Sequence, residues 1–282
     1  MSLTKLNVSL EEFEIGLSGA VPDRRDWSEP AMDRGILEFV SLFSGLVLKY
    51  GGRIVHGSHP TFTPIILRQA RLHAGERFRK PVTLVMSELW AADLQVDQIQ
   101  AITDVAELII TKKVGTGSAS DNETRNQSLT AMRRVLVDTQ NIMVAVGGKL
   151  HSGDGKRPGV GEEMDLAQRK KVPRFLVAGL GGYARKLAKD LTPDSLGNGL
   201  PRRENVRLFR TDDVAACVNV LFDHLALSKS LRKAALQPIK WNPDLRAIVD
   251  HRNGKIASAS ECIMRTEGVA GMSMQDGAQD LL

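Results

Sequence analysis

The sequence predicts an α/β fold: a doubly wound parallel sheet with helices on both faces and a helical C-terminal extension. Short, nearly continuous apolar runs alternate with longer segments whose apolar residues recur at helical spacing. Glycine clusters follow five of the predicted strands, at 18–20, 57–58, 115–117, 147–148 and 179–182. Because ligands of such folds bind at the carboxyl ends of the strands, we expect these loops to converge on one pocket.

The composition favours a cytoplasmic protein that binds small anions. The 282 residues carry a net charge of +5, and basic residues are interspersed with acidic ones, which gives little support to nucleic-acid binding. The two cysteines, Cys217 and Cys262, exclude a disulfide framework or a four-cysteine zinc site. We find no signal peptide and no apolar run of membrane-spanning length, so no membrane partner is expected.

The first half of the chain begins with two strand-loop-helix units. A strand is predicted at 13–18, followed by a helix at 31–50 that ends at Gly51-Gly52. A second strand at 53–56 leads to a helix at 63–76, where Pro64 after a threonine cap is typical of a helix start. Further strands are expected at 81–86 and 106–111, with a polar stretch at 87–103 between them.

The second half continues the alternation. A helix is predicted at 122–140, where Leu129, Met132 and Leu136 share one face. The remaining predicted strands are 142–146, 172–178 and an edge strand at 206–209. The remaining predicted helices are one that carries Glu162, Glu163 and Asp165, one at 183–191, and one that begins at 212 and extends to Leu236.

The stretch from Asn141 to Lys171 is the strongest candidate for a binding site. An apolar strand stops at Gly147 and Gly148, a loop follows that carries Lys149 and Arg157, and a helix then begins. Helix N-termini attract anions through unpaired N–H groups and the helix dipole. We therefore interpret this junction as a phosphate-binding loop, made by Gly147, Gly148, Lys149, Arg157, Gly159 and Gly161.

Other residues at strand ends are further candidates for ligand contact. They are Ser18, Gly19, Gly57, Ser58, His59, Thr116, Gly117, Gly181 and Gly182. His56 and His59 have no third metal ligand near them in the sequence, so no metal site is predicted. The G-x-G-x-x-G fingerprint is missing after the first strand, so no NAD redox cofactor, and no other cofactor, is expected.

Three segments together resemble the SLOG superfamily: GGRIVHGS, ETRNQSLTAM and VGGK…RPGVGEEMDLA. This superfamily includes the Lonely-Guy phosphoribohydrolases, the DNA-processing protein DprA and nucleotide-sensing domains that accompany TIR or sirtuin-type effectors in bacterial antiviral defence. The resemblance covers residues 12–235 and implies a Rossmann-like nucleotide-binding domain at 1–237. Residues 238–282 would form a partly flexible C-terminal extension.

The resemblance also implies roles for three residues. In the hydrolases, an arginine and a glutamate remove the base from a nucleoside monophosphate, and Arg125 and either Glu162 or Glu163 match these positions. The family's proline before the paired glycines is here Val146, and the loop after them is longer. These departures favour a sensor of an ADP-ribose or cyclic-nucleotide signal over a hydrolase, and DprA-like DNA binding ranks third. The resemblance implies a TIR or sirtuin-type partner, and we expect a homo-oligomer.

Overall fold

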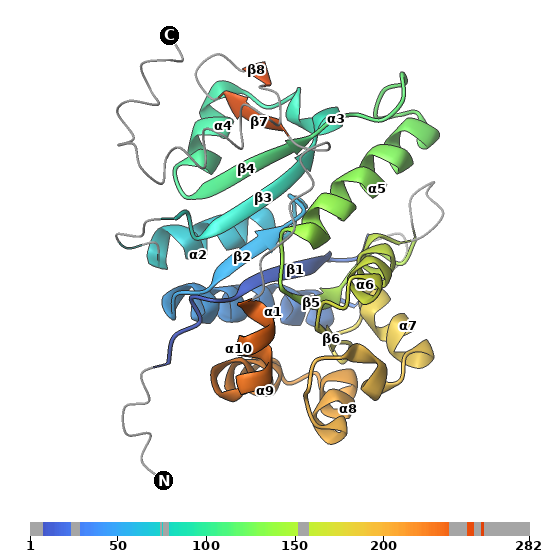
Figure 1. Ribbon diagram of the computed structural model, residues 1–282. Helices are drawn as coiled ribbons and strands as arrows, with labels where there is room; N and C mark the ends of the chain where they lie inside the picture. Colours follow the sequence, from blue (N-terminus) through green and yellow to red (C-terminus); the bar gives the residue numbers. More distant parts are fainter. Residues whose placement is uncertain are drawn as a thin grey trace.

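The computed structural model describes residues 8–23, 29–73, 75, 79–151, 158–236, 247–250 and 255–256. Within them lies a sheet in the order β6-β5-β1-β2-β3-β4-β7-β8, in which β1 to β6 are parallel, β7 pairs antiparallel with β4, and β8 pairs antiparallel with β7 (Figure 1). The strands are β1 (Glu14–Ala20), β2 (Arg53–His56), β3 (Val82–Ser87), β4 (Ala106–Thr111), β5 (Ile142–Gly147), β6 (Arg174–Val177), β7 (Ala247–Asp250) and β8 (Lys255–Ile256).

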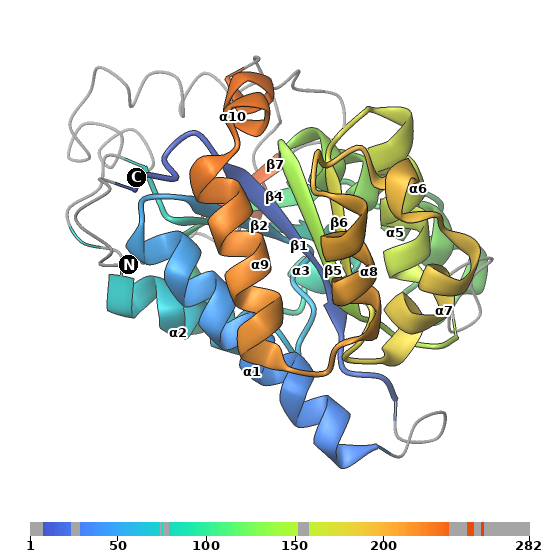
Figure 2. The ribbon, with the colours of Figure 1, turned by 90° about the horizontal axis from the view of Figure 1, so that it is seen from below.

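Helices cover both faces of the sheet. Figure 2 shows α1, α2 and α9 on one side and α5, α6 and α7 on the other. The helices are α1 (Pro30–Lys49), α2 (Thr63–His73), α3 (Glu88–Ala91), α4 (Val96–Thr103), α5 (Asn122–Asp138), α6 (Gly159–Arg169), α7 (Gly182–Asp190), α8 (Arg202–Arg210), α9 (Val214–Leu227) and α10 (Lys229–Ala235), with a 3-10 turn at Pro193–Leu196. The predicted doubly wound α/β fold is thereby confirmed.

The central strands are buried on both faces, which explains their continuous apolar sequence. In β5, Val144 packs into the core beneath α1, whereas its neighbours Met143 and Ala145 pack into the core beneath α6. Alternate residues of a strand point to opposite faces, so each position of β5 must be apolar. Covering both faces leaves only the ends of the strands open for a ligand.

The chain reverses its direction across the sheet between β1 and β5. From β1 the strands proceed outward through β2 and β3 to β4, and the chain then returns along α5 to place β5 on the other side of β1. The loops after β1 and β5 therefore diverge, which leaves a crevice at the carboxyl ends of these two strands. Such a switch point is the usual ligand position in open α/β sheets.

Some predicted elements were wrong. Residues 206–209 belong to helix α8, in which Asn205 and Leu208 are buried at helical spacing and Asn205 bonds to Asn198. The predicted helix at 212–236 breaks at Ser228, whose hydroxyl caps α10. The polar stretch at 87–103 contains α3 and α4, and Ser18 lies inside β1, two residues before its end.

The structure describes only some of the residues in the predicted C-terminal extension. Helices α8, α9 and α10 complete the predicted domain, and the described residues beyond 237 form β7 and β8. The division at residue 237 stays a prediction. In the described portion, no single helix has the length and apolar character to cross a membrane, and only the bent pair α9 and α10 meets that test when counted together.

Candidate functional site

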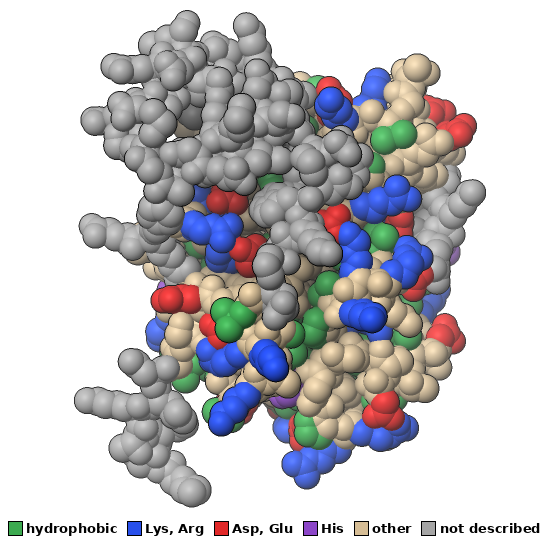
Figure 3. Space-filling view, in the orientation of Figure 1, with side chains coloured by type: hydrophobic (Ala, Val, Ile, Leu, Met, Phe, Trp, Pro, Cys, Tyr) green, Lys and Arg blue, Asp and Glu red, His purple; other side chains and the backbone are tan. Residues whose placement is uncertain are grey.

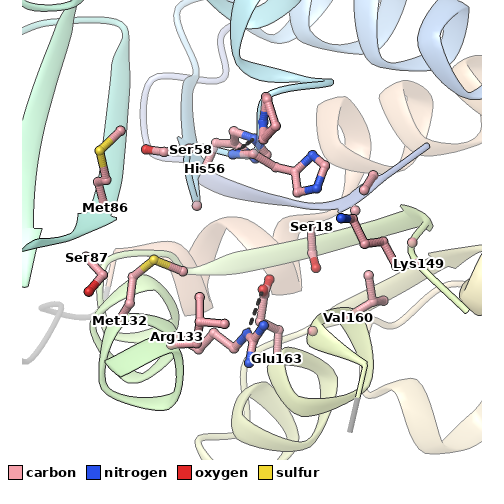
Figure 4. A pocket seen from close by; sticks show the side chains of 18 of the residues that line it. Ser18, His56, Ser58, Met86, Ser87, Met132, Arg133, Lys149, Val160 and Glu163 are labelled. Atoms are coloured by element: carbon pink, nitrogen blue, oxygen red, sulfur yellow. Dashed lines mark hydrogen bonds and ion pairs between the residues drawn. The ribbon is translucent and has the colours of Figure 1, made fainter. Parts of the chain in front are cut away.

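A cavity of about 600 Å³ opens at the carboxyl ends of β1, β2, β3 and β5. Its size lies in the range of small-molecule sites. Figure 4 shows its side chains in three groups: Lys149 and Val160 at one end, Ser18, Arg133 and Glu163 in the middle, and Ser58, Met86 and Met132 at the other end. The cavity therefore changes from a polar turn to an apolar wall along its length.

The polar end is built by the exit of β5 and the start of α6. Gly148, Lys149, Gly159 and Val160 line it. The backbone N–H of Gly148 donates to the Ala20 carbonyl at 2.7 Å, so it already has an acceptor within the protein. The first N–H groups of α6 have no acceptor within the helix, and Pro158 before them supplies no side-chain cap. An anion at this end would be bound by the start of α6 and by Lys149.

Lys149 is held loosely at the cavity rim. Its Nζ lies 3.5 Å from a carboxylate oxygen of Asp23, and the side chains of Lys149 and Asp23 are 43% and 40% exposed. An exposed pair of this kind contributes little to stability. Lys149 can therefore turn toward a bound phosphate at small cost.

The middle of the cavity contains a buried carboxyl-guanidinium cluster. Glu163 lines the cavity, and its Oε1 lies 3.7 Å from Nε of Arg133. Burial raises the pKa of the Glu163 carboxyl above its ordinary value, and the charge of Arg133 opposes that rise. The hydroxyl of Ser18 faces the same carboxyl, and hydrogen bonding from it also opposes the rise.

Glu162 makes different contacts from Glu163. Its two carboxylate oxygens accept hydrogen bonds from Thr130 at 2.6 Å and from Arg133 at 2.5 Å, both on α5. Glu162 thus fixes the Arg133 guanidinium from behind, and Glu163 meets it on the cavity side. Of the two predicted glutamates, Glu163 lies in the cavity lining and Glu162 does not.

The loop after β2 presents two histidines. Nδ1 of His56 donates to the Leu17 carbonyl at 2.8 Å, so its Nε2 accepts the backbone N–H of His59 at 3.2 Å. Nδ1 of His59 accepts the N–H of Thr61 at 3.3 Å, which leaves the proton of the neutral ring on Nε2. Burial lowers the pKa of both rings, that of His59 to about 4, so both are neutral at neutral pH.

The far end of the cavity is mostly apolar. Met86, Trp90, Leu129 and Met132 line it, from β3, α3 and α5, and Ser87 lies beside Met86 and Met132. The hydroxyl of Ser58 is the buried polar group beside them without a hydrogen-bond partner in the described part of the chain. This end suits a flat, largely uncharged group.

The structure brings together the candidates from three of the five predicted loops. Ser18, Gly19, Gly57, Ser58, His59, Gly148, Lys149 and Gly159 line the cavity, as do Arg125 and Glu163. Gly147 and Gly161, from the same junction, do not line it. Arg157 lies outside the described residues.

The loops at 115–117 and 179–182 do not reach the cavity, so their predicted convergence was wrong. Thr116 and Gly117 belong to the turn before α5, where the Gly117 N–H donates to the Thr124 hydroxyl. Gly181 and Gly182 pack behind the cavity, and a Cβ on Gly182 would lie 2.5 Å from the Gly147 carbonyl carbon. Gly161 in turn makes room for the ring of Tyr183. These glycines permit close packing of the backbone.

Sequence reasoning missed Arg133 and the apolar wall. Arg133 follows Arg125 by eight residues, slightly more than two helical turns, so both face the cavity from α5. That spacing was a usable signal. Met86, Trp90 and Met132 carried none, because apolar residues on a strand or helix ordinarily indicate core packing. Cys217 is buried in the core, and burial raises its thiol pKa to about 12, so it is an inert structural residue.

The fold and the cavity define an α/β protein of the doubly wound class with a small-molecule site at its switch point. The family model described as SLOG cluster2 matches residues 10–242, and the chain belongs to this family, which confirms the resemblance. No curated protein matches the chain. The X-ray structure of TM1055, a target of the Northeast Structural Genomics Consortium, is similar with 14% identity, 65% of this chain and 84% of that chain covered, and a TM-score of 0.41.

Proposed function

We propose that this chain binds a nucleotide-derived ligand of the ADP-ribose or cyclic-nucleotide type and acts as a sensor module. The observation that carries the proposal is the order of groups along the cavity, from the start of α6 through Glu163 to the apolar wall. A phosphate, a sugar and a base occur in the same order in a nucleotide. Membership of the SLOG superfamily supports a nucleotide-related function.

Each part of the cavity suits the matching part of such a ligand. The uncapped start of α6 and Lys149 would bind phosphate. The Glu163 carboxyl would accept hydrogen bonds from ribose hydroxyls, and the neutral His59 ring would offer a donor without adding charge. The apolar wall would receive the base.

The Glu163 carboxyl also favours a second candidate, hydrolysis of the N-glycosidic bond of a nucleoside monophosphate. Its raised pKa places it nearer to neutral pH than an ordinary glutamate, which suits a general acid or base. Arg133 lies on one side of it, and Arg125 lines the same cavity. This constellation is compatible with a reaction at the sugar, so both readings must be tested with the same ligands.

Binding is tested by calorimetric titration of the purified chain with AMP, ADP-ribose and cyclic AMP. The substitution Arg133→Ala should weaken binding by about tenfold or more, because it leaves Glu163 as an uncompensated buried carboxyl. Arg134→Ala is the matched control, since Arg134 is the next residue of α5 and is exposed. Equal affinities for the two variants and the wild type would refute the placement of the ligand.

Turnover is tested by chromatography of the same mixtures for free base. The sensor reading expects the ligand to be recovered intact after hours of incubation. Rapid release of base by the wild type, lost in Glu163→Gln but kept in Glu162→Gln, with melting curves showing that both variants are folded, would establish the hydrolase instead.

The sensor reading includes two further proposals, an effector partner of TIR or sirtuin type and a homo-oligomer. Both can be examined by light scattering with and without bound ligand. DNA binding of the DprA kind ranks last, because the net charge is only +5, and on the described part of the face in Figure 3 Lys and Arg lie among Asp and Glu. A nucleic-acid site usually gathers its basic side chains into a patch or stripe.

A further inference from the structure

Ser58 adopts a backbone conformation that its residue type disfavours. Its φ is +55°, in the left-handed region, where an L side chain crowds the backbone. Glycine would adopt this conformation freely, and Gly57 stands immediately before it. The backbone strain at position 58 therefore arises because the residue carries a side chain.

That side chain is a hydroxyl placed in an apolar part of the cavity. The Oγ atom of Ser58 is buried and has no hydrogen-bond partner among the described residues. Figure 4 shows it on the same side of the cavity as Met86 and Met132, away from Lys149. A buried hydroxyl without a partner is costly, and one beside a cavity can be satisfied by a group that enters the cavity.

Lys171 provides a contrast within the same chain. It is the other non-glycine residue described with a positive φ, at +58°. It follows the end of α6, where its N–H donates to the Gln168 carbonyl, and its side chain is exposed. A left-handed residue commonly ends a helix, so the conformation of Lys171 has a local explanation. Ser58 is not at a helix end, and it lines the cavity.

From these observations we infer that Ser58 is a specificity-determining residue, whose hydroxyl bonds to the edge of a flat heteroaromatic ring held between Met86, Met132 and Trp90. The inference rests on the proposed function and deepens it, because it assigns the base of the nucleotide to this end of the cavity. Thioether and aromatic side chains contact ring faces well, while a single hydroxyl can read one polar atom of the ring edge. Ser58 thus separates ligands by the ring they carry.

The test compares three ligands and three variants. Calorimetric affinities are measured for AMP, for ADP-ribose and, by competition, for ribose 5-phosphate, which has the sugar and phosphate but no base. The variants are Ser58→Ala, which removes the hydroxyl and keeps the strain, Ser58→Gly, which removes both, and Lys171→Gly, which relieves the same strain away from the cavity.

Both Ser58 variants should bind AMP and ADP-ribose about 3- to 10-fold more weakly, the effect of one net hydrogen bond, and bind ribose 5-phosphate as the wild type does. Lys171→Gly should bind all three ligands unchanged. Melting temperatures of the free variants identify any loss caused by misfolding, and Ser58→Gly, which relieves strain, remains informative if Ser58→Ala folds poorly.

The outcomes separate the two proposals. If the wild type binds AMP or ADP-ribose and Ser58→Gly binds them equally well, the role of Ser58 is wrong and the proposed function stands. If the Ser58 variants weaken ribose 5-phosphate as much as AMP, the hydroxyl contacts sugar or phosphate, and the assignment of the base is overturned. If the wild type binds neither these ligands nor cyclic AMP, the proposed function itself fails.

Discussion

Clusters of arginine and glutamate lie at both ends of the strands, at the amino ends (the amino edge) and at the carboxyl ends (the carboxyl edge). The two clusters differ in how completely their hydrogen bonds are satisfied. At the amino edge, Arg53 donates to Glu14, Thr83 and Glu107 at 3.0–3.1 Å and to the Lys80 carbonyl at 3.0 Å. The guanidinium thereby ties the first residues of β1 and β2 to β3 and β4. At the carboxyl edge, Arg133 and Glu163 border an open cavity, in which the buried Ser58 hydroxyl lacks a hydrogen-bond partner in the described structure.

This difference in hydrogen bonding separates a structural cluster from one suited to ligand binding. Each of the three guanidinium nitrogens of Arg53 donates to at least one acceptor within the protein, so the amino-edge cluster fixes strand register without a ligand. The carboxyl-edge cluster leaves polar atoms that can bond to a ligand in the cavity. Incomplete satisfaction, strained backbone and shifted pKa values cluster at functional sites.

The largest effect is expected at the amino edge. Arg53→Met keeps most of the side-chain volume but leaves the buried Glu14 carboxylate with only the partly exposed Arg79. Breaking a buried ion pair from one side costs about 3–5 kcal/mol, so the free energy of unfolding should fall by that amount. Denaturation in urea measures it.

The control for this change is Arg203→Met. Arg203 pairs with Glu204 on the surface of α8, and 85% of its side chain is exposed. Its loss should change the free energy of unfolding by no more than about 0.5 kcal/mol. If both substitutions cost the same, the contrast between a buried and an exposed cluster does not hold.

A smaller effect is expected from the histidines of the carboxyl edge as the pH falls. The pKa of His59 is about 4 in the folded protein against an ordinary value of 6.5, so between these values the unfolded chain binds more protons. Stability is therefore lost as the pH falls from 6.5 to 4, by about 2–3 kcal/mol after allowance for partial exposure of the ring. Melting curves of the wild type and His59→Gln should diverge over this window, and parallel curves would refute the burial of His59.

Glu163→Gln should change stability in the opposite direction. Because the folded protein raises the pKa of Glu163 above its ordinary 4.5, the folded state holds this proton more tightly than the unfolded chain. Wild-type stability is thus lost as the pH rises from 4.5 through the folded pKa, and glutamine has no proton to release. The variant should melt higher than the wild type at neutral pH, by a margin that shrinks to nothing below pH 4.5. A lower melting temperature at neutral pH would mean that Glu163 is structural, like Glu14.

The smallest effect concerns the two strained residues. Ser58→Gly and Lys171→Gly each replace a left-handed L residue by glycine, which should raise the free energy of unfolding by about 0.5–1 kcal/mol. The gain should be similar for both, since their φ values are +55° and +58°. A gain at Lys171 with a loss at Ser58 would show that the Ser58 side chain packs for stability and would weaken the comparison between the edges.

The sequence by itself determined the layered α/β fold and the junction from Asn141 to Lys171. Continuous apolar runs such as 142–146, which stops at two glycines, are typical of strands covered on both faces, and glycines followed by a helix start predict an anion site. These are local signals, carried by neighbours along the chain. They located the exit of β5 correctly, whereas Gly159 and Gly161, predicted in the loop, lie in the first turn of α6.

Only the tertiary structure decided which loops share a cavity and which glutamate enters it. Strand order places β1 between β5 and β2, which brings Ser18, Ser58 and Gly148 together and leaves Gly117 and Gly182 to pack elsewhere. Adjacent residues of a helix point about 100° apart, and packing of α6 against α5 turns Glu162 to Thr130 and Glu163 to the cavity. Both outcomes depend on contacts between segments distant in sequence, and those contacts leave no mark in the local pattern of residues.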